Sequence, residues 1–246
     1  CGHRDPCMER DDLLIYSVRM ADKPTRYRSS FAIKEIVAGA SALSNEERAM
    51  LSKQQCLFDD DCSSSISSLN PWWGELTAVH YLLQKNVRPR IGNAQYRRFW
   101  GERELLHLPP YALGMACPIY FGCSLGDQFR GGHGFDGEAM SIHLAQRGKL
   151  PFSPEELRTV WGQNVFQGGP MAIGNFEHYK ILMTILFDCL WPIWDEYKDY
   201  IQTLSGYDTR AIAFLSERLL SGIVLYRGKF MPRIPLHNIP LGFIGP

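Results

Sequence analysis

Short apolar segments alternate along this chain with stretches that carry helix-start signals, and this alternation is the feature that most restricts the fold. Leu13 to Val18 is apolar and β-branched, which is typical of a buried strand, and Arg90 to Ala94 is predicted to be another strand. Asn70-Pro71 begins a predicted helix, because asparagine is a common N-cap and proline fits the first helical position. Strands that alternate with helices predict an α/β fold.

Four further segments carry signals for individual elements. Phe31 to Leu43 is either a helix or a strand followed by a turn. A short helix is predicted to start near Asn45, with Asn45 or Ser44 as its N-cap, and Ser153 to Glu156 starts another. Phe58 to Ser68 is acidic and then rich in serine, which is typical of a loop.

The C-terminal part is predicted to be mainly helical. Phe176 to Phe187 is strongly helical, and Pro192 is expected to kink or end that helix, since proline lacks the amide proton. Asp208 is expected to cap the next helix, which contains Glu217. Met231 to Ile239 contains prolines and is predicted to be an irregular tail or an edge strand.

The composition is that of an ordinary globular protein, with 45% hydrophobic and 21% charged residues among 246. The formal net charge is zero, which argues against an extended nucleic-acid interface. The most apolar segment, Ile181 to Trp194, is interrupted by Asp188 and Pro192 and is too short to cross a bilayer. Because the chain starts at Cys1 without an initiator methionine or a hydrophobic signal sequence, we expect a fragment or a processed product.

Seven cysteines form an odd set, and three pairs share one spacing. These pairs are Cys1 with Cys7, Cys56 with Cys62, and Cys117 with Cys123. The spacing is wider than the about two to four intervening residues of the usual zinc pair, so a zinc knuckle is not expected. We predict mainly reduced thiols, with Cys189 buried in an apolar helix.

The segment from Ile91 to Trp100 brings two arginines to the end of a predicted strand. Arginine stays charged and presents a planar fork of donors that fits phosphate or carboxylate oxygens. Side chains alternate along a strand, so Tyr96 and Arg98 are expected on one face and Arg97 on the other, unless the chain leaves the sheet there. Ligands of open α/β sheets bind beyond the carboxyl ends of strands, which makes this pair a candidate anion site. The alternative is that both arginines pair with surface acids and stack on Phe99 or Trp100.

Glu75 lies in the first turn of the helix that is predicted to start at Asn70. It flanks an apolar stripe that includes Leu76 and Val79. Glu75 is either a favourable negative charge near the positive end of the helix or a carboxylate directed at a ligand or an arginine.

Glycine is dense between residues 131 and 137, where His133 and Asp136 also occur. Such a segment is either a flexible surface loop or a lid that carries these two side chains over a site.

The helix that contains Glu217 has two different faces. Its buried stripe is expected to consist of Ile212, Leu215 and Leu219. Arg210, Phe214 and Glu217 fall on the opposite side. That side faces either solvent or a cleft.

Three motifs occur here in the order found in a known family. They are Asn70-Pro71-Trp72-Trp73-Gly74-Glu75-Leu76-Thr77, Tyr96-Arg97-Arg98-Phe99, and Ser205-Gly206-Tyr207 followed by Phe214-Leu215-Ser216-Glu217-Arg218-Leu219-Leu220. Together they resemble the domain-of-unknown-function 4422 (DUF4422) family, a group of glycosyltransferases associated with bacterial capsule and surface-polysaccharide synthesis. The resemblance extends from about residue 13 to residue 220 and is poor between residues 105 and 169.

The resemblance implies a GT-A-like, Rossmann-like nucleotide-diphospho-sugar transferase fold with a central, mostly parallel sheet flanked by helices. We accordingly expect an N-terminal extension (residues 1–12), a GT-A-like glycosyltransferase domain (13–228) and a C-terminal tail (229–246).

Enzymes of this kind must stabilise a nucleoside diphosphate as it leaves, usually with a metal held by an Asp-x-Asp pair. The corresponding position here is Gln95-Tyr96-Arg97-Arg98, which has no carboxylate, and the arginines are expected to stabilise the diphosphate instead. Asp59-Asp60-Asp61 precedes the Asn70 helix and is expected in a donor-side loop. No cofactor is required by this interpretation; the alternative is a divalent metal (Mn or Mg) at Asp59 and Asp61.

Glu217 is our first candidate for the base that removes the proton from the acceptor hydroxyl, and Asp136 is the second. The alternative is that Glu217 pairs with an arginine and only supports the site. The resemblance also implies a set of substrate-binding residues. They are Lys23, Asp60, Asn70, Glu75, Tyr96, Arg97, Arg98, His133 and Arg210.

The chain departs from the family pattern at two places. Gln95 stands where the family usually has histidine, and Arg19 to Asp22 replaces the usual Thr-His after the first strand. These departures leave the donor, and activity itself, open.

We therefore expect a glycosyltransferase of the hexosyltransferase class. It would transfer a sugar from a nucleotide-diphosphate sugar, with a UDP-sugar of the UDP-galactose type as the expected donor, to a saccharide or lipid-linked saccharide acceptor in polysaccharide synthesis. We expect a cytoplasmic protein with at most peripheral contact with the inner face of the membrane and no nucleic-acid partner.

Two other classes remain. One is a degenerate relative that binds a nucleotide sugar or glycan without turning it over. The other is a thiol or hydrolytic enzyme that uses Cys117 or Cys123 with His133 or His143, although no nucleophile-elbow or cysteine-protease signature supports it.

Overall fold

The computed structural model describes residues 12–86 and 88–244, and within them a nine-stranded sheet forms the centre of the fold. The order is β10-β6-β9-β4-β1-β2-β3, and β5 and β11 pair beside β4. The strands are β1 (Leu13–Arg19), β2 (Ala32–Val37), β3 (Leu57–Phe58), β4 (Arg90–Gln95), β5 (Arg98–Trp100), β6 (Leu113–Ala116), β9 (Ala172–Asn175), β10 (Leu236–Ile239) and β11 (Leu241–Phe243). A separate small sheet pairs β7 (Ile119–Tyr120) with β8 (Val165–Phe166).

Most of the central strands are parallel. β1 pairs in parallel with β2 and β4, β2 with β3, and β10 with β6, whereas β9 runs antiparallel to β4 and β6. The chain passes outward from β1 to β2 and β3 and then returns to place β4 on the other side of β1. This reversal is a topological switch point, where open α/β sheets bind ligands. The expected α/β class with a mostly parallel sheet is confirmed.

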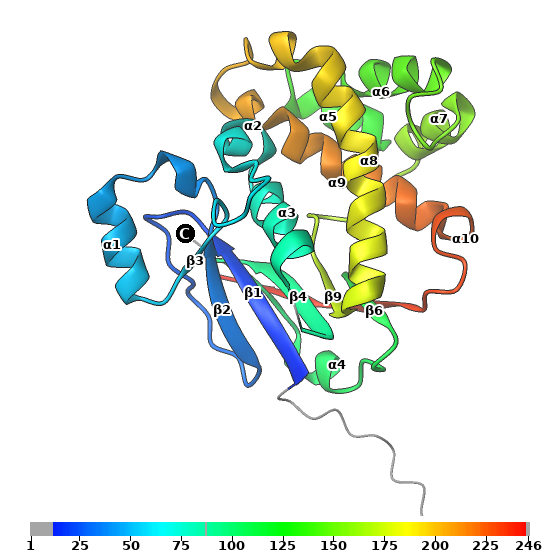
Figure 1. The fold of residues 1–246 in the computed structure, drawn as a ribbon. Helices are drawn as coiled ribbons and strands as arrows, with labels where there is room; N and C mark the ends of the chain where they lie inside the picture. The colour runs from blue at the N-terminus through cyan, green and yellow to red at the C-terminus, as the bar shows by residue number, and fades with distance from the viewer. Residues whose placement is uncertain (1–11, 87, 245–246) are drawn as a thin grey trace, which may run out of the picture.

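Helices flank the sheet on its faces and crowd one end of it (Figure 1). They are α1 (Asn45–Lys53), α2 (Asn70–Trp73), α3 (Leu76–Lys85), α4 (Glu102–Leu106), α5 (Leu125–Gly132), α6 (Gly137–Gln146), α7 (Pro154–Gly162), α8 (Phe176–Ile201), α9 (Ala211–Leu225) and α10 (Arg227–Phe230), with short 3-10 turns η2 (Ala40–Ala42), η3 (Ser67–Leu69) and η4 (Gly206–Arg210). In Figure 1, α3 and α8 lie over the viewer's face of the sheet, and α2, α5, α6 and α7 gather beyond the end to which β1 points.

Strand β1 is buried on both faces, which explains why its sequence is a continuous apolar run rather than an alternating one. Tyr16 and Val18 belong to the large core that the sheet shares with the helices. Leu13 and Ile15 point to the other face, into a smaller core that includes Trp100.

Local helix signals are confirmed at two N-termini. Ser44, rather than Asn45, caps α1: its side chain accepts from the Glu47 amide, and the Glu47 carboxylate accepts from the Ser44 amide. Ser153 and Glu156 form the same reciprocal pair at α7. In such capping boxes two otherwise unpaired amides gain partners within four residues, so the sequence alone specifies them.

The segment that was either a helix or a strand with a turn is strand β2 followed by η2. The helix predicted to start at Asn70 is in fact two helices, because the chain turns at Gly74 with φ of 55° before α3 begins. Asn70 is not the N-cap either. Its side-chain amide donates to the Gly74 carbonyl at 2.8 Å and so holds the break in place.

Pro192 does not end helix α8, which continues through it to Ile201, and buried neighbours such as Leu190 supply packing that offsets the one missing backbone hydrogen bond. The expected kink stays a prediction. The second prediction about a helix end was wrong. Asp208 does not cap α9, whose N-cap position is Arg210 without a side-chain cap.

The C-terminal segment contributes β10 and β11 to the main sheet, and the predicted edge strand is confirmed. Most of the N-terminal extension, including the Cys1 and Cys7 pair, lies outside the described residues. The described cysteines are free thiols, and Cys189 is buried in α8 as expected. None of the helices in the described ranges combines the length and apolarity needed to span a bilayer.

Candidate functional site

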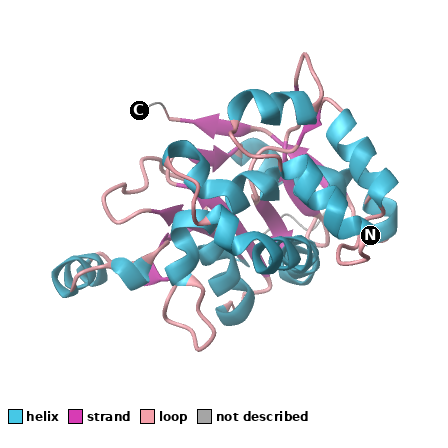
Figure 2. Cartoon of the chain, turned by 90° about the horizontal axis from the view of Figure 1, so that it is seen from above, coloured by secondary structure: helices cyan, strands magenta, loops and turns pink. Residues whose placement is uncertain are grey.

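A cleft of about 710 Å³ opens at the switch point between β1 and β4. Val18 and Arg19 form its floor at the end of β1, and Gln95 does so at the end of β4. The opposite wall comes from α5, η4 and α9. Figure 2 shows the molecule from above, looking onto the end at which the cleft opens. Small-molecule sites typically occupy about 300–1,000 Å³, so this cleft has a suitable size.

The structure brings most of the predicted site residues to this cleft. Those that line it are Lys23, Asn70, Glu75, Tyr96, Arg97, Arg98, His133, Arg210 and Glu217. Asp59, Asp60, Asp61 and Asp136 do not line it. On the helix that carries Glu217, the side opposite the buried stripe therefore faces a cleft and not bulk solvent.

Both hairpin arginines reach the cleft because the chain reverses after β4. The regular strand ends at Gln95, which pairs with Arg98 across a turn formed by Tyr96 and Arg97. The expected alternation between opposite faces therefore does not apply, and Tyr96, Arg97 and Arg98 all line the cleft.

Two guanidinium groups in the cleft pack against glycine. A β-carbon added to Gly74 would lie 2.9 Å from Arg210 Nη2, and one added to Gly169 would lie 3.4 Å from Arg98 Nη1. Both glycines have positive φ, so other residues would be strained there. Within the described chain, Arg97, Arg98 and Arg210 have no carboxylate partner in an ion pair. Their charges are thus available to an anion.

Glu75 lies among these arginines and is partly buried. Gln95 Nε2 donates to Glu75 Oε2 at 2.5 Å. Burial raises the pKa of Glu75, although the Gln95 hydrogen bond and the charge of Arg98 act to lower it. Gln95, which replaces the family's histidine, therefore serves here as the hydrogen-bond partner of a carboxylate.

Glu217 extends from α9 into the same cleft, with 21% of its side chain exposed. Burial raises the pKa of Glu217 to about 6; the Arg218 guanidinium opposes this shift and Glu75 adds to it. Arg218 Nη1 donates to Glu217 Oε2 at 2.8 Å, so the ion pair considered in the sequence analysis is present. A carboxyl group that changes charge near neutral pH is suited to proton transfer.

The loop after β1 is held in place by a buried ion pair. Arg19 Nη1 donates to Glu35 Oε2 at 2.7 Å, and the other Glu35 oxygen accepts from the Thr25 amide at 2.8 Å. Burial alone would raise the pKa of Glu35, but the hydrogen bonds from Thr25 and Arg19 outweigh it and lower the pKa. Glu35 therefore stays ionised at neutral pH and fixes the loop that brings Lys23 to the cleft.

The glycine-rich segment forms the end of α5 and the turn that leads to α6, and its His133 lines the cleft. His133 Nδ1 lies 2.8 Å from Asp208 Oδ1, and the Gly134 amide donates to Asp208 Oδ2 at 2.8 Å. Burial lowers the pKa of His133, whereas Asp208 acts to raise it, so the ring is neutral at neutral pH. Asp136 caps α6 by accepting from the Ala139 amide. Asp208 thus joins η4 to this turn, which accounts for its absence from the α9 cap.

The three consecutive aspartates have protein partners away from the cleft. Asp59 is buried and accepts from the backbone amides at residues 39 and 40 and from Ser67. Asp60 and Asp61 both pair with Arg48. In the described part of the chain, no group of three or more His, Cys, Asp or Glu side chains is arranged to hold a metal ion. The partners of these aspartates are thus protein groups in this structure, and a metal at Asp59 and Asp61 stays a prediction.

Several residues that line the cleft were not among those predicted from the sequence. They are Phe121, Gln128, Phe166, Tyr207 and Arg218. Tyr207 and Arg218 lie in the third motif of the resemblance, which was a usable signal. The other three come from distant segments with no motif, so only the folded chain shows their position.

The thiol alternative has no support from this geometry. Cys117 and Cys123 are exposed, and neither lines the cleft. Over the described ranges, neither thiol has a hydrogen bond to His133 or His143. A cysteine nucleophile requires such a base within reach.

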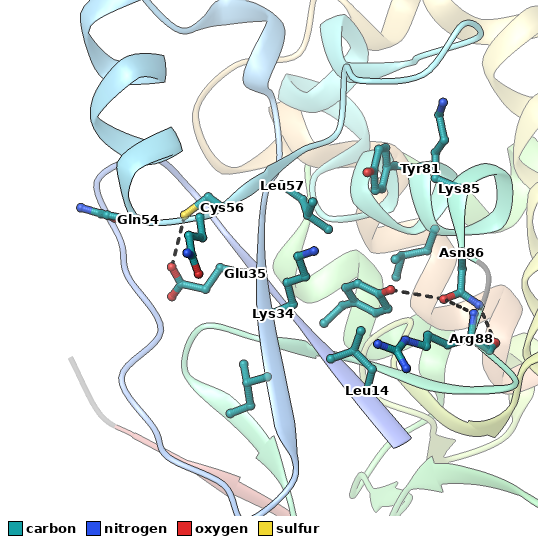
Figure 3. Close-up of a pocket in the computed structure, with 14 residues that line it drawn as sticks. Leu14, Lys34, Glu35, Gln54, Cys56, Leu57, Tyr81, Lys85, Asn86 and Arg88 are labelled. Atoms are coloured by element: carbon teal, nitrogen blue, oxygen red, sulfur yellow. Dashed lines mark hydrogen bonds between the residues drawn. The ribbon is translucent and has the colours of Figure 1, made fainter. Parts of the chain in front are cut away.

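A second hollow of about 810 Å³ lies between α3 and the segment after α1, beside the first half of β1 (Figure 3). Lys34, Lys85 and Arg88 surround it, and all three are exposed. Its one carboxylate, Glu35, is the partner of Arg19. This hollow is not at the carboxyl end of the strands, so the cleft is the better candidate.

Comparisons with known proteins agree with this fold. Residues 18–117 match the family model described as "Domain of unknown function (DUF4422)", which confirms the resemblance to that family. No curated protein sequence matches the chain significantly.

Of two solved structures compared with this chain, one shares the fold. The apo structure of the WbbM bifunctional glycosyltransferase has a TM-score of 0.71 at 16% identity, covering 96% of this chain and 46% of that one. The chain thus spans about half the length of that protein. Apo mouse xyloside xylosyltransferase 1 has a TM-score of 0.34 at 12% identity, with 93% and 84% covered. The WbbM comparison shows that this chain has a fold found in a glycosyltransferase.

Proposed function

We propose that this protein is a glycosyltransferase that moves a hexose from a nucleotide-diphosphate sugar to a saccharide acceptor. A UDP-sugar of the UDP-galactose type is the proposed donor, and surface-polysaccharide synthesis is the proposed pathway. One observation carries the proposal: the cleft at the switch point combines three arginines that form no ion pair within the described residues with a carboxyl group whose pKa is near neutrality. The family match and the fold of the WbbM structure support it.

The arginines account for donor binding. Arg97 and Arg98 stand at the hairpin beyond β4, and Arg210 approaches from η4. A diphosphate bound among them would receive planar donor pairs from three directions. As the bond between the sugar and the diphosphate breaks, negative charge grows on the diphosphate oxygens, and fixed positive charges stabilise that change.

Glu217 accounts for acceptor activation. Its Oε2 accepts from Arg218, and Oε1 has no hydrogen-bond partner in the described part of the chain. Oε1 takes the proton from the acceptor hydroxyl while the oxygen of that hydroxyl forms its bond to the anomeric carbon of the donor sugar. The bond from the anomeric carbon to the diphosphate oxygen breaks with its electron pair, and Glu217 is left protonated.

A non-catalytic relative is the second candidate. The observation that favours it is the ion pair between Glu217 and Arg218, which stabilises the ionised carboxylate without requiring a substrate. Gln95, at a position where the resemblance implies histidine, also favours a non-catalytic relative. Such a protein would bind the nucleotide sugar and release no product.

The test is a thermal-shift and nucleotide-release screen with UDP-, GDP-, dTDP- and CMP-sugars, each with Mg²⁺ or Mn²⁺ and with a chelator. Wild type is compared with Arg97→Ala and Glu217→Ala. We expect stabilisation by one nucleotide class that Arg97→Ala loses, and slow donor hydrolysis that Glu217→Ala loses. Binding without hydrolysis or transfer would identify the non-catalytic relative, and no stabilisation by any donor would exclude both. Retention of activity in the chelator would support a diphosphate site made by arginines.

A further inference from the structure

The cleft has two chemically different sides. The side at the strand ends carries Lys23, Arg97 and Arg98, whereas the side formed by α5, η4 and α9 carries aromatic rings next to Arg210, Arg218 and Glu217. His133, Tyr207 and Phe214 form the centre of the aromatic side. The His133 and Tyr207 rings lie 5.6 Å apart at an angle of 6°, and Phe214 lies 4.4 Å from His133 and 4.6 Å from Tyr207.

Tyr207 is the exposed member of this group. Its exposed fraction is 67%, whereas the Phe214 side chain beneath it is 8% exposed. His133 covers one face of the Tyr207 ring, and the adjacent Asp208 is hydrogen-bonded to both His133 and the Gly134 amide. The ring therefore packs against His133 and Phe214 and keeps a large uncovered surface at the cleft. Such exposure is informative because the residue also lines a site.

Polar groups lie next to this aromatic surface. Gln128, Arg210 and Glu217 line the same wall of the cleft. Arg218, which pairs with Glu217, is positioned by the Phe129 and Phe166 rings at 5.0 and 4.8 Å from their centroids. A sugar has an apolar face of C–H groups and an edge of hydroxyls, so a flat ring beside amide, guanidinium and carboxylate groups matches both parts.

The nucleotide has a different location in the cleft. The switch point lies between the ends of β1 and β4, where Val18, Met20 and Tyr96 line the floor. Nucleotides of open α/β sheets bind at that point. The aromatic side is across the cleft from it, and Glu217 belongs to the helix on that aromatic side.

From this arrangement, and resting on the glycosyltransferase function proposed above, we propose that the aromatic side of the cleft binds the acceptor saccharide, with Tyr207 stacking on the sugar ring. The sugar hydroxyls then face Gln128 and Glu217, and Arg210 stays with the diphosphate. This places an acceptor hydroxyl beside the proposed base and leaves the nucleobase to the strand ends.

The test is a binding titration followed by NMR signals of labelled tyrosine rings. The probes are the methyl glycosides of galactose, glucose, N-acetylglucosamine, mannose and rhamnose, each titrated with and without saturating nucleotide of the class found in the donor screen. The variants are Tyr207→Ala and Tyr207→Phe, and Tyr111→Ala is the matched control because Tyr111 is 61% exposed and does not line the cleft.

We expect at least one glycoside to shift the Tyr207 ring signals. Its dissociation constant should increase about three- to tenfold in Tyr207→Ala, remain near wild type in Tyr207→Phe, and not change in Tyr111→Ala. In transfer assays Tyr207→Ala should raise the acceptor KM by the same factor while the nucleotide dissociation constant stays near that of wild type.

Two results would overturn the inference. One is a loss of nucleotide affinity in Tyr207→Ala, since the ring would then stack on the nucleobase. The other is saccharide binding that is absent throughout the panel or independent of Tyr207. Because nucleotide binding is measured separately, failure of the donor screen rejects the glycosyltransferase proposal, whereas nucleotide binding without a Tyr207-dependent saccharide rejects only the acceptor site.

Discussion

The cleft and the second hollow are similar in volume, and both are lined by several basic side chains, yet their charges have different environments. Around the hollow, Lys34, Lys85 and Arg88 are exposed to water, where a charge costs little to maintain. In the cleft, Arg98 and Glu75 are only partly exposed, and Glu217 has a raised pKa.

This difference shows that the number of cations does not identify a site. A charge that is partly removed from water without a full set of partners lowers the stability of the folded chain, and an anionic ligand can supply the missing partner. The hollow has no such deficit, because its one carboxylate is paired with Arg19 and its cations are solvated. If burial of charge is what distinguishes the two regions, substitutions in the cleft should change ligand binding and turnover more than matched substitutions around the hollow.

The largest effect is expected from Glu217→Gln, which keeps the shape of the side chain and removes its basicity. Transfer should fall about 10²- to 10⁴-fold in kcat, the range for loss of a general base, while nucleotide affinity changes little. Asp136→Asn is the matched control, since asparagine keeps the N-cap of α6 and Asp136 is outside the cleft. Steady-state kinetics of both variants decide between the two base candidates, and equal losses in both would contradict the assignment to Glu217.

The next largest effect is expected on nucleotide affinity, when one arginine of the cleft and one of the hollow are each replaced by alanine. Arg98→Ala should weaken nucleotide diphosphate binding about 10- to 100-fold, since a hydrogen bond to a charged group contributes about 1.5–3 kcal/mol. Arg88→Ala, at the rim of the hollow, should change the dissociation constant less than about twofold because the side chain is solvated. Calorimetric titration with UDP measures both. A similar loss in Arg88→Ala would mean that the hollow is the nucleotide site.

The raised pKa of Glu217 predicts that kcat/KM depends on pH near neutrality. The hollow cannot produce this dependence, because the pKa of its one carboxylate, Glu35, is lowered. The base must be ionised, so kcat/KM should rise with pH through about 6 and become flat above it. Below that pH the rate should fall about tenfold per pH unit. A pH profile of kcat/KM tests this, and Glu217→Gln should abolish the acid limb. Because Glu75 interacts with Glu217, the measured value belongs to the pair.

The same shift has a consequence for stability, with a defined sign. The pKa of Glu217 is raised from 4.5 to about 6 in the folded chain, so its contribution to stability is fully present below pH 4.5 and is lost as the pH rises through 6. The loss should be about 2 kcal/mol. Urea unfolding across this range should show a smaller decline in Glu217→Gln, and an equal decline would contradict the shift.

The smallest effect is expected from Gly74→Ala, with Gly148→Ala as its control. Both glycines have positive φ, so alanine should lower the free energy of unfolding of each variant by about 1–2 kcal/mol. A β-carbon at Gly74 would also displace Arg210, whereas nothing lies within 4 Å of one at Gly148. Nucleotide affinity should therefore fall a few-fold only in Gly74→Ala, as measured by the same titration. Equal affinities in the two variants would show that Arg210 does not contact the ligand.

The sequence by itself determined the parts of this protein that depend on neighbouring residues. The apolar run of β1, the capping box at Ser44 and the start of α7 form within a few residues, so local physics specifies them. The motifs around Arg97 and Glu217 also located much of the cleft, because each carries its chemistry in a short segment.

Tertiary structure decided how these segments meet. Because the chain turns after Gln95, Arg97 and Arg98 both line the cleft. Gln95 itself donates a hydrogen bond to Glu75, which lies 20 positions earlier in the chain. Packing around α8 allowed the helix to continue through Pro192, although proline alone predicts a kink or an end. Asp208 joined His133 across 75 residues instead of capping its own helix. Such contacts depend on which surfaces the fold buries together, a long-range balance that no local pattern of residues encodes.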